Sequence, residues 1–360
     1  MAQISLAIIG CGAYIGAHLE VLPQVPEFQV VALVDPALGQ TKACQERWFP
    51  TQPVAHFADH SEMLRQMKPE AVIVSTPHAW HFRHCLDALA AGAHVLVDKP
   101  MVTNSDDART LVEFAKTQDR ALLVAAQGFY FDTFAYARRL IADGALGQPQ
   151  VISGLMASGW MKYGVNTWRQ DPHLSGGGNL HDSAVHVLGA MLALANSPVQ
   201  EVCCWTERKQ LPVDVNAVVL LRFANGILAT LANDGNCECW DSHVHYQGQR
   251  GFLRLNPYSG DFTLRLCDTS STVTAVPADW PTPSVTPLRN FADVILGLAQ
   301  PRCDGLLGVA VSDVLEILYE SARNETPVKM IRTAPSEWCG SETRPQRDAG
   351  GNHPTAAWKK

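Results

Sequence analysis

The first chemical signal in the sequence is a trio of closely spaced glycines near its start. Gly10, Gly12 and Gly16 follow an apolar run at 4–9 and open a segment that can form a helix. The first glycine permits a tight turn, the second lets the backbone approach a pyrophosphate, and the third lets the helix pack on the strand. The N-terminus of that helix favours phosphate charge. We therefore expect a dinucleotide site at these glycines and at the intervening Ala13, Tyr14 and Ile15.

An acidic residue stands where the second strand of such a unit ends. Asp35 closes the apolar run at 29–34, about 20 residues beyond the last glycine, where a carboxylate binds the ribose hydroxyls. Pro36 follows it, and the next cation is Lys42, so a 2′-phosphate would meet an anion without a counter-charge. The cofactor expected from these residues is NAD, favoured over NADP.

Three further polar residues are of types that support acid–base chemistry. Lys99 follows the apolar run at 94–97, at the carboxyl edge of a parallel sheet, where open α/β folds bind ligands. Asp182 and His186 are four residues apart and would share one face of a helix. Oxidation of a secondary alcohol needs a base of near-neutral pKa and a cation that holds the developing alkoxide. These residue types match that need.

Three spaced motifs give the chain a family resemblance. They are the glycine motif, the segment 76–81 with the triplet at 98–100, and the segment 175–186 with its glycine-rich turn and Asp-x-x-x-His pattern. Over roughly residues 4–330 they resemble the Gfo/Idh/MocA family of sugar and inositol dehydrogenases. The family's Glu-Lys-Pro triplet begins here with Asp98, a conservative departure that keeps the lysine.

The resemblance implies a role for the residues of these motifs. His186 would be the acid/base, Lys99 would polarise the reacting oxygen, and Asp182 would orient or support them by hydrogen bonds. The family chemistry needs no metal, so none is expected at Asp182 and His186. On the cofactor side, Lys99 would be joined by Ser75, Thr76, Pro77, His81 and Asp98.

Substrate contacts are expected from a loop before the glycine-rich turn and from the domain junction. Aromatic rings with amides and cations suit a polyol, because rings stack on C–H faces while polar groups bind hydroxyls. The same tryptophans could instead pack the loop against a sheet, and His181 could contact substrate or solvent. Trp205 and Trp240 lie in strand-like segments and are expected to pack in a sheet or an interface. The predicted substrate contacts are Lys99, Tyr130, Trp160, Tyr163, Trp168, Arg169, His181, Asp182 and His186, with Lys162 and Asn166 on the same loop.

A scaffold of two parts would position these residues. In the first third, continuous apolar runs alternate with helical segments, which is typical of a doubly wound parallel sheet. From residue 200, period-two segments and turn signals such as Asn225-Gly226 predict a large, open, mostly antiparallel sheet. The expected fold class is α/β, with an NAD-binding Rossmann domain at 1–126, an α+β substrate and oligomerisation domain at 127–330, and a flexible tail at 331–360. Strands are expected at 4–9, 29–34, 71–75, 94–97, 121–125, 148–156, 201–208, 217–223, 227–233, 243–247, 251–255 and 262–266, and helices at 81–91, 105–118, 133–143 and 306–323.

The composition excludes several classes of protein. A chain of 360 residues with 47% hydrophobic and 18% charged residues is typical of a globular protein with two domains. A net charge of −7 argues against nucleic-acid binding, and no apolar run is long enough to cross a membrane. The first strand runs directly into the glycine motif, so we expect no signal peptide, and ten scattered cysteines indicate reduced thiols in the cytoplasm. The spacing of Cys237, Cys239, His243 and His245 does not favour a zinc site.

Several functions stay open on the sequence alone. The leading hypothesis is hydride transfer between NAD and a secondary alcohol of a sugar, inositol or related polyol. The alternatives are a redox-neutral glycosidase or epimerase that retains NAD, and a non-catalytic NAD-binding regulator. In the resembling family the broad second sheet mediates subunit association, so we expect a homodimer or homotetramer, with no nucleic-acid or membrane partner.

Overall fold

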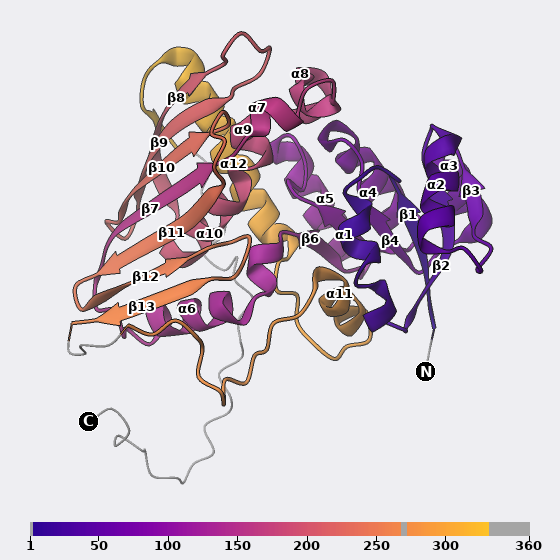
Figure 1. Cartoon of the computed structure of the whole chain (residues 1–360), viewed down its shortest axis with the longest axis horizontal. Coiled ribbons are helices and arrows are strands. Elements are labelled where there is room, and N and C mark those ends of the chain that lie inside the picture. The colour runs from indigo at the N-terminus through magenta and orange to yellow at the C-terminus, as the bar shows by residue number, and fades with distance from the viewer. Residues whose placement is uncertain (1–2, 268–271, 331–360) are drawn as a thin grey trace.

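The computed structural model describes residues 3–267 and 272–330, which form two lobes, each built on one sheet (Figure 1). The first lobe contains a six-stranded sheet in the order β3-β2-β1-β4-β5-β6, in which all neighbouring strands are parallel. Its strands are β1 (Ile4–Ile9), β2 (Phe28–Val34), β3 (Ala55–Phe57), β4 (Ala71–Val74), β5 (His94–Asp98) and β6 (Leu122–Ala125). Its helices are α1 (Ile15–Leu19), α2 (Leu38–Trp48), α3 (His60–Met67), α4 (His81–Ala90) and α5 (Ser105–Thr117).

The central strands of this sheet are buried on both faces. In β1, Ala7 and Ile9 belong to one core cluster, whereas Leu6 and Ile8 belong to a second cluster. This burial explains why the strand sequences are continuously apolar and not alternating. The predicted strands are found within two residues at each end, but β3 was not predicted because its three residues, Ala-His-Phe, form no apolar run.

The second lobe contains an eight-stranded sheet in the order β13-β12-β11-β7-β10-β9-β8-β14. Neighbouring strands are antiparallel except β7 and β10, which confirms the prediction of a mostly antiparallel sheet. One face is buried, since the residues of β9 alternate between buried and exposed. The strands are β7 (Pro149–Ala157), β8 (Val199–Glu207), β9 (Asn216–Phe223), β10 (Leu228–Asp234), β11 (Asp241–Gly248), β12 (Gly251–Leu255), β13 (Phe262–Leu266) and β14 (Val328–Lys329).

The helices of the second half connect the two lobes. The long helix α12 packs on β8 and also on α5 and α10 (Figure 1). Leu288 and Phe291 of α11 join the core cluster that contains strand residues of the first sheet. A helix that comes after seven of the eight strands of the second sheet in sequence therefore packs in the first lobe. These helices are α6 (Asp132–Ala142), α7 (Trp160–Tyr163), α8 (Pro172–Ser175), α9 (Asn179–Asp182), α10 (Val185–Ala195), α11 (Pro287–Ile295) and α12 (Gly305–Asn324).

The predicted α/β fold class, a parallel Rossmann sheet followed by a large antiparallel sheet, is confirmed. Among the helices of the described residues, none has the length and apolar character that a membrane span requires. The predicted tail at 331–360 lies outside the described residues.

Candidate active site

The glycine motif lies at the carboxyl edge of the first sheet, at the strand where the order reverses. β1 stands between β2 and β4, and such a switch point is where open α/β sheets bind ligands. Gly10 has a φ of +96°, and a Cβ there would clash with the carbonyl oxygen of Ser75. A Cβ on Gly12 would meet no atom within 4 Å, so the backbone is open where a pyrophosphate would approach. The loop therefore fits a dinucleotide.

Asp35 is held beside this loop. Its Oδ2 accepts a hydrogen bond from the backbone N–H of Cys11 at 3.1 Å, and its Oδ1 accepts one from that of Ala37 at 2.9 Å. Each carboxylate oxygen keeps a further lone pair for a ribose hydroxyl. The half-buried carboxylate is thus oriented by the loop that would hold the pyrophosphate, which fits NAD.

Two residues predicted to contact the cofactor lie behind the site instead. Asp98 is buried, and its two oxygens accept hydrogen bonds from His18 Nε2 at 2.8 Å and Ser75 Oγ at 2.6 Å. His81 is fully buried, with ring nitrogens 2.9 Å and 2.8 Å from the carbonyl oxygens of Pro100 and Thr76. Both side chains are used to tie neighbouring loops together, so they position the cofactor edge and do not face it.

A buried ion pair connects the two lobes at this edge. Lys99, which follows β5, donates hydrogen bonds to Asp182 Oδ1 at 2.8 Å and to the Asp182 carbonyl oxygen at 2.6 Å. The other carboxylate oxygen accepts hydrogen bonds from Trp160 Nε1 at 2.8 Å and from Arg169 Nε at 3.1 Å. Burial opposes the charge of this carboxylate, but Lys99, His78 and Arg169 outweigh it and hold the pKa of Asp182 well below its usual range. Asp182 is therefore an anion that anchors Lys99.

His186 lies beside this pair as a buried, neutral base. Burial, followed by the charge of Lys99, lowers the pKa of His186 well below its ordinary value. Its ring packs against the ring of Tyr258, with 4.4 Å between the centroids. A neutral imidazole has one nitrogen lone pair that can accept a proton. The site thus places a cation beside a free imidazole lone pair, although burial puts the pKa of this imidazole below the near-neutral value expected of the base.

The helix predicted to carry Asp182 and His186 is interrupted. α9 ends at Asp182 and α10 begins at Val185, with a two-residue turn between them. The glycine-rich turn before α9 is fixed by Asp214, which accepts hydrogen bonds from the backbone N–H groups of Gly178 and Leu180 at 2.8 Å and 2.9 Å. Asp214 was not predicted from the sequence, because it lies more than thirty positions from this turn, between β8 and β9.

Three of the predicted substrate contacts are buried, with partners inside the protein. Trp160 is fully buried and uses its N–H to bind Asp182. Tyr130 is 1% exposed, and its hydroxyl donates to the Val124 carbonyl oxygen, so it belongs to the core. His181 is 2% exposed and packs near His78, with 5.5 Å between the rings, so it does not face solvent.

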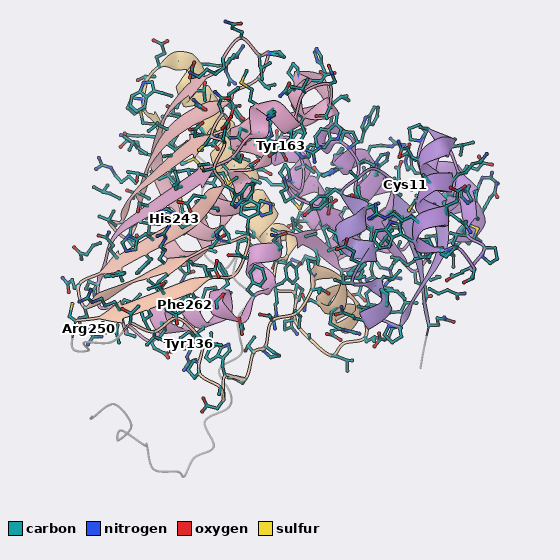
Figure 2. All side chains as sticks on the ribbon, viewed as in Figure 1. Cys11, Tyr136, Tyr163, His243, Arg250 and Phe262 are labelled. Atoms are coloured by element: carbon teal, nitrogen blue, oxygen red, sulfur yellow. The ribbon has the colours of Figure 1, made fainter. Side chains whose placement is uncertain are left out.

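Other predicted residues do surround the ion pair. Trp168 packs on His78, with 4.5 Å between ring centroids, and the Arg169 guanidinium lies 4.5 Å from the Trp168 ring. Tyr163 is 50% exposed, lies between the two lobes in Figure 2, and places its hydroxyl 3.1 Å from Ser183 Oγ. Lys162 and Asn166 of the same segment are exposed.

Two aromatic residues and a histidine around the site were not among the predicted contacts. Tyr258 follows β12 and carries no local sequence signal, yet its ring lies on His186. Trp240 was expected to pack in a sheet or an interface; it precedes β11, is half-exposed and contacts Tyr258. His78 stands within a recognised motif and could have been proposed; its Nε2 is 3.8 Å from Asp182 Oδ1.

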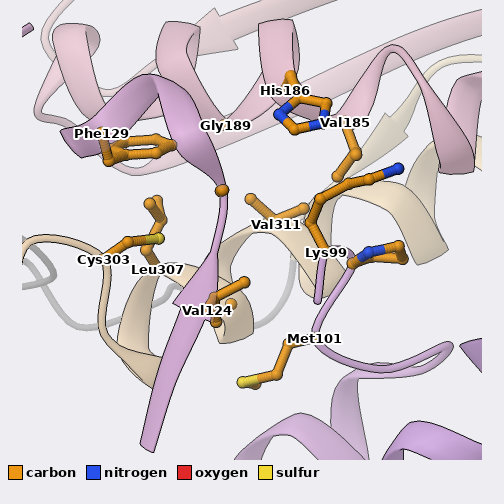
Figure 3. A pocket seen from close by; sticks show the side chains of 13 residues that line it. Lys99, Met101, Val124, Phe129, Val185, His186, Gly189, Cys303, Leu307 and Val311 are labelled. Carbon is orange, nitrogen blue, oxygen red and sulfur yellow. The ribbon is translucent and has the colours of Figure 1, made fainter. Parts of the chain in front are cut away.

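A small apolar cavity lies behind the reacting groups (Figure 3). Its volume is about 30 Å³, and Lys99 and His186 form part of its wall. The rest of the wall is almost entirely apolar and offers few polar partners to a water molecule on this side of the two groups. The other lining side chains include Met101, Val124, Phe129, Val185, Leu307 and Val311.

Comparison with known families gives the class of protein. Residues 4–126 match the Gfo/Idh/MocA oxidoreductase family with its NAD-binding Rossmann fold, and residues 134–254 match the C-terminal domain of the same family. The chain belongs to the Gfo/Idh/MocA family of oxidoreductases, and its first lobe is the NAD-binding domain.

Two individual relatives match only part of this chain, at modest sequence identity. The chain is 30% identical over 201 residues to D-glucoside 3-dehydrogenase of Escherichia coli strain K12, a match that spans 55% of this chain and 55% of that protein. It is 25% identical to the NADP⁺-dependent D-xylose 1-dehydrogenase of Haloarcula marismortui, over 72% of this chain and 74% of that protein. The crystal structure of aldose-aldose oxidoreductase from Caulobacter crescentus, complexed with glycerol, shares the fold, with a TM-score of 0.77 and 23% identity over 91% of this chain and 99% of that one.

Proposed function

We propose that the protein oxidises a secondary hydroxyl group of a sugar, inositol or related polyol with NAD, or catalyses the reverse reduction. The observation that carries this proposal is the Lys99–Asp182 ion pair beside the neutral His186, at the edge of the sheet that binds the cofactor. When bound, NAD supplies the acceptor for the hydride that leaves the carbinol carbon.

Lys99 has the hydrogen-bonding capacity to hold the reacting oxygen. An ammonium group has three N–H donors, and two of them are used by the carboxylate and the carbonyl oxygen of Asp182. The third is left for the substrate oxygen, where it stabilises the negative charge that develops as the proton leaves. The proton moves from the hydroxyl oxygen to a ring nitrogen of His186.

Asp182 has a positioning role in this scheme. Its carboxylate already accepts hydrogen bonds from Lys99, Trp160 and Arg169, and it stays ionised, so it is a poor proton acceptor. The name of the Escherichia coli relative, a D-glucoside dehydrogenase, supports a sugar as the substrate class.

Replacement of Lys99 tests the function directly. We expect Lys99→Ala to lower kcat/KM by roughly a hundredfold or more, because a charged group at the reacting oxygen is lost. NAD affinity, measured by fluorescence titration, should change little, and Lys116→Ala on the exposed face of α5 is the control. Near-native turnover in Lys99→Ala would remove the residue from the mechanism.

A panel of sugars and inositols, with product analysis, separates the alternatives. Accumulation of NADH, followed by its ultraviolet absorbance, indicates net oxidation. Product without NADH indicates a redox-neutral glycosidase or epimerase that retains NAD, and NAD binding without any product indicates a regulator.

We also propose a cytoplasmic homodimer or homotetramer. The cysteines of the described residues are free thiols, which suits a reducing compartment. Half-exposed apolar residues adjoin one another on the outer face of the second sheet, where Trp205 is opposite Val218 and Leu228 is opposite Val151. A row of this kind is typical of a surface that associates with another subunit.

A further inference from the structure

An exposed tryptophan stands next to the catalytic centre. The Trp240 ring is 53% exposed and meets the Tyr258 ring edge-on, at 4.8 Å between centroids and 89° between planes. The Tyr258 ring in turn lies on His186 at 4.4 Å. The sum of the two centroid distances, about 9 Å, is the upper limit of the separation between the Trp240 and His186 rings.

The backbone holds this tryptophan in place. The Cys237 N–H donates to the Ser158 carbonyl oxygen at 3.1 Å, and the Met161 N–H donates to the Gly235 carbonyl oxygen at 2.7 Å. These bonds fix the 235–240 loop against the segment that ends in Tyr163. Aromatic side chains presented from a fixed backbone lose little entropy when they bind a ligand.

A second exposed ring belongs to the same group. The hydroxyls of Tyr163 and Tyr258 both reach Ser183, at 3.1 Å from its Oγ and 2.7 Å from its carbonyl oxygen respectively. Ser183 directly follows Asp182, so these rings are tied to the turn that carries the catalytic groups. We call Tyr163, Trp240 and Tyr258 the aromatic rim.

The aromatic rim differs from the apolar face of the second sheet. Trp205 is exposed to a similar extent, 52%, but the residue opposite it across the strands is the half-exposed Val218. Trp240 instead contacts a residue of the active site. Its exposed surface is therefore suited to a ligand that extends from the catalytic centre.

We propose that the aromatic rim binds the aglycone of a glycoside, whose sugar ring presents the reacting hydroxyl to Lys99 and His186. The Tyr258 ring contacts His186 directly, whereas Trp240 contacts Tyr258, so Trp240 stands one ring further from His186 and suits the group attached to the sugar under oxidation. An aromatic side chain binds such a ring by stacking on its apolar face, whether that ring is a second sugar or an aromatic group. This inference rests on the proposed function and narrows the substrate from any polyol to glycosides.

Kinetics with matched substrates tests the aromatic rim. The probes are D-glucose, methyl D-glucoside and phenyl D-glucoside, each glucoside as both anomers. We expect kcat/KM to be highest for a phenyl glucoside, and Trp240→Ala to lower the phenyl-to-methyl ratio by roughly fivefold to tenfold. Trp240→Phe should keep most of the ratio, and Trp205→Ala should leave it unchanged.

A binding measurement makes the test independent of turnover. In saturation-transfer NMR with NADH-loaded protein, the phenyl protons of the glucoside should receive strong saturation, which Trp240→Ala removes. If the protein oxidises D-glucose, and the phenyl-to-methyl ratio of kcat/KM is the same in the native and Trp240→Ala proteins, the inference is overturned while the proposed function stands. Phenyl saturation that is absent, or unchanged in Trp240→Ala, also overturns it. Phenyl saturation that depends on Trp240, without turnover of any probe, supports the rim and counts against the proposed oxidation.

Discussion

Substitution of Asp182 by asparagine removes a negative charge that three side chains share. Lys99 and Trp160 each lie 2.8 Å from a carboxylate oxygen, and Arg169 lies at 3.1 Å. Removal of one partner of a buried ion pair typically costs about 3–5 kcal/mol, because the remaining charge loses its compensation. The side chains of Lys99 and Arg169 are 13% and 27% exposed, so solvent screens part of the loss. We therefore expect a destabilisation near the lower end, about 3 kcal/mol.

The catalytic effect of Asp182→Asn should exceed what instability alone produces. The amide still fills the space, but it no longer fixes the ammonium that holds the substrate oxygen, so kcat should fall by roughly a hundredfold. The assays are urea unfolding and NADH formation, both below the unfolding temperature of the variant.

A second buried ion pair provides the matched control. Asp313 of α12 is 3% exposed at its side chain and binds Arg109 of α5 at 2.6 Å, in the contact between these two helices. Asp313→Asn should be similarly destabilised and keep its kcat. Native kcat in Asp182→Asn, or an equal loss of kcat in both variants, would refute the reasoning.

Four other predictions concern the cofactor, pH, packing and assembly. Asp35→Ala should weaken NAD binding much more than NADP binding in parallel titrations, because the carboxylate favours ribose hydroxyls over a phosphate; equal losses would contradict this. Burial lowers the pKa of His181 to about 4, whereas an unfolded histidine titrates near 6.5. Below about pH 6.5 the unfolded chain therefore binds more protons than the folded protein. As the pH is lowered from about 6.5 to about 4, the free energy of unfolding should decrease by about 1.4 kcal/mol per pH unit for this group. In urea unfolding at several pH values His181→Gln should flatten that slope, and an unchanged slope would argue against a neutral buried ring. Gly189→Ala should raise the unfolding free energy by up to about 1 kcal/mol, because it lies within α10 and its Cβ would have ordinary contacts of 3.5–3.6 Å at the cavity wall. Gly154→Ala, whose Cβ would lie 2.6 Å from a methionine sulfur, should destabilise the protein; thermal unfolding of both glycine variants measures the two effects. Leu228→Glu on the outer sheet face should lower the mass measured by light scattering, and a native protein that is monomeric at micromolar concentration would refute the assembly.

Local signals in the sequence determined the scaffold and the cofactor site. A strand, a glycine turn and a helix follow one another within residues 4–19, and the interactions that specify them act over a few positions. The alternation of apolar and polar residues likewise predicted the second sheet, since it depends only on which residues of each strand face the core. The strand at 55–57 was not predicted, because a segment of three residues is too short to show a hydrophobic period.

The tertiary structure alone decided what each polar side chain does. Lys99 and Asp182 are 83 positions apart, and they meet only because the fold brings the residue that follows β5 to the end of α9, in the other lobe. The sequence assigned Trp160 to the substrate, but packing buries it and turns its N–H to Asp182, whereas Trp240 is left at the surface beside Tyr258. Residue type predicts which bonds a side chain can form, but burial and partner depend on how distant segments pack.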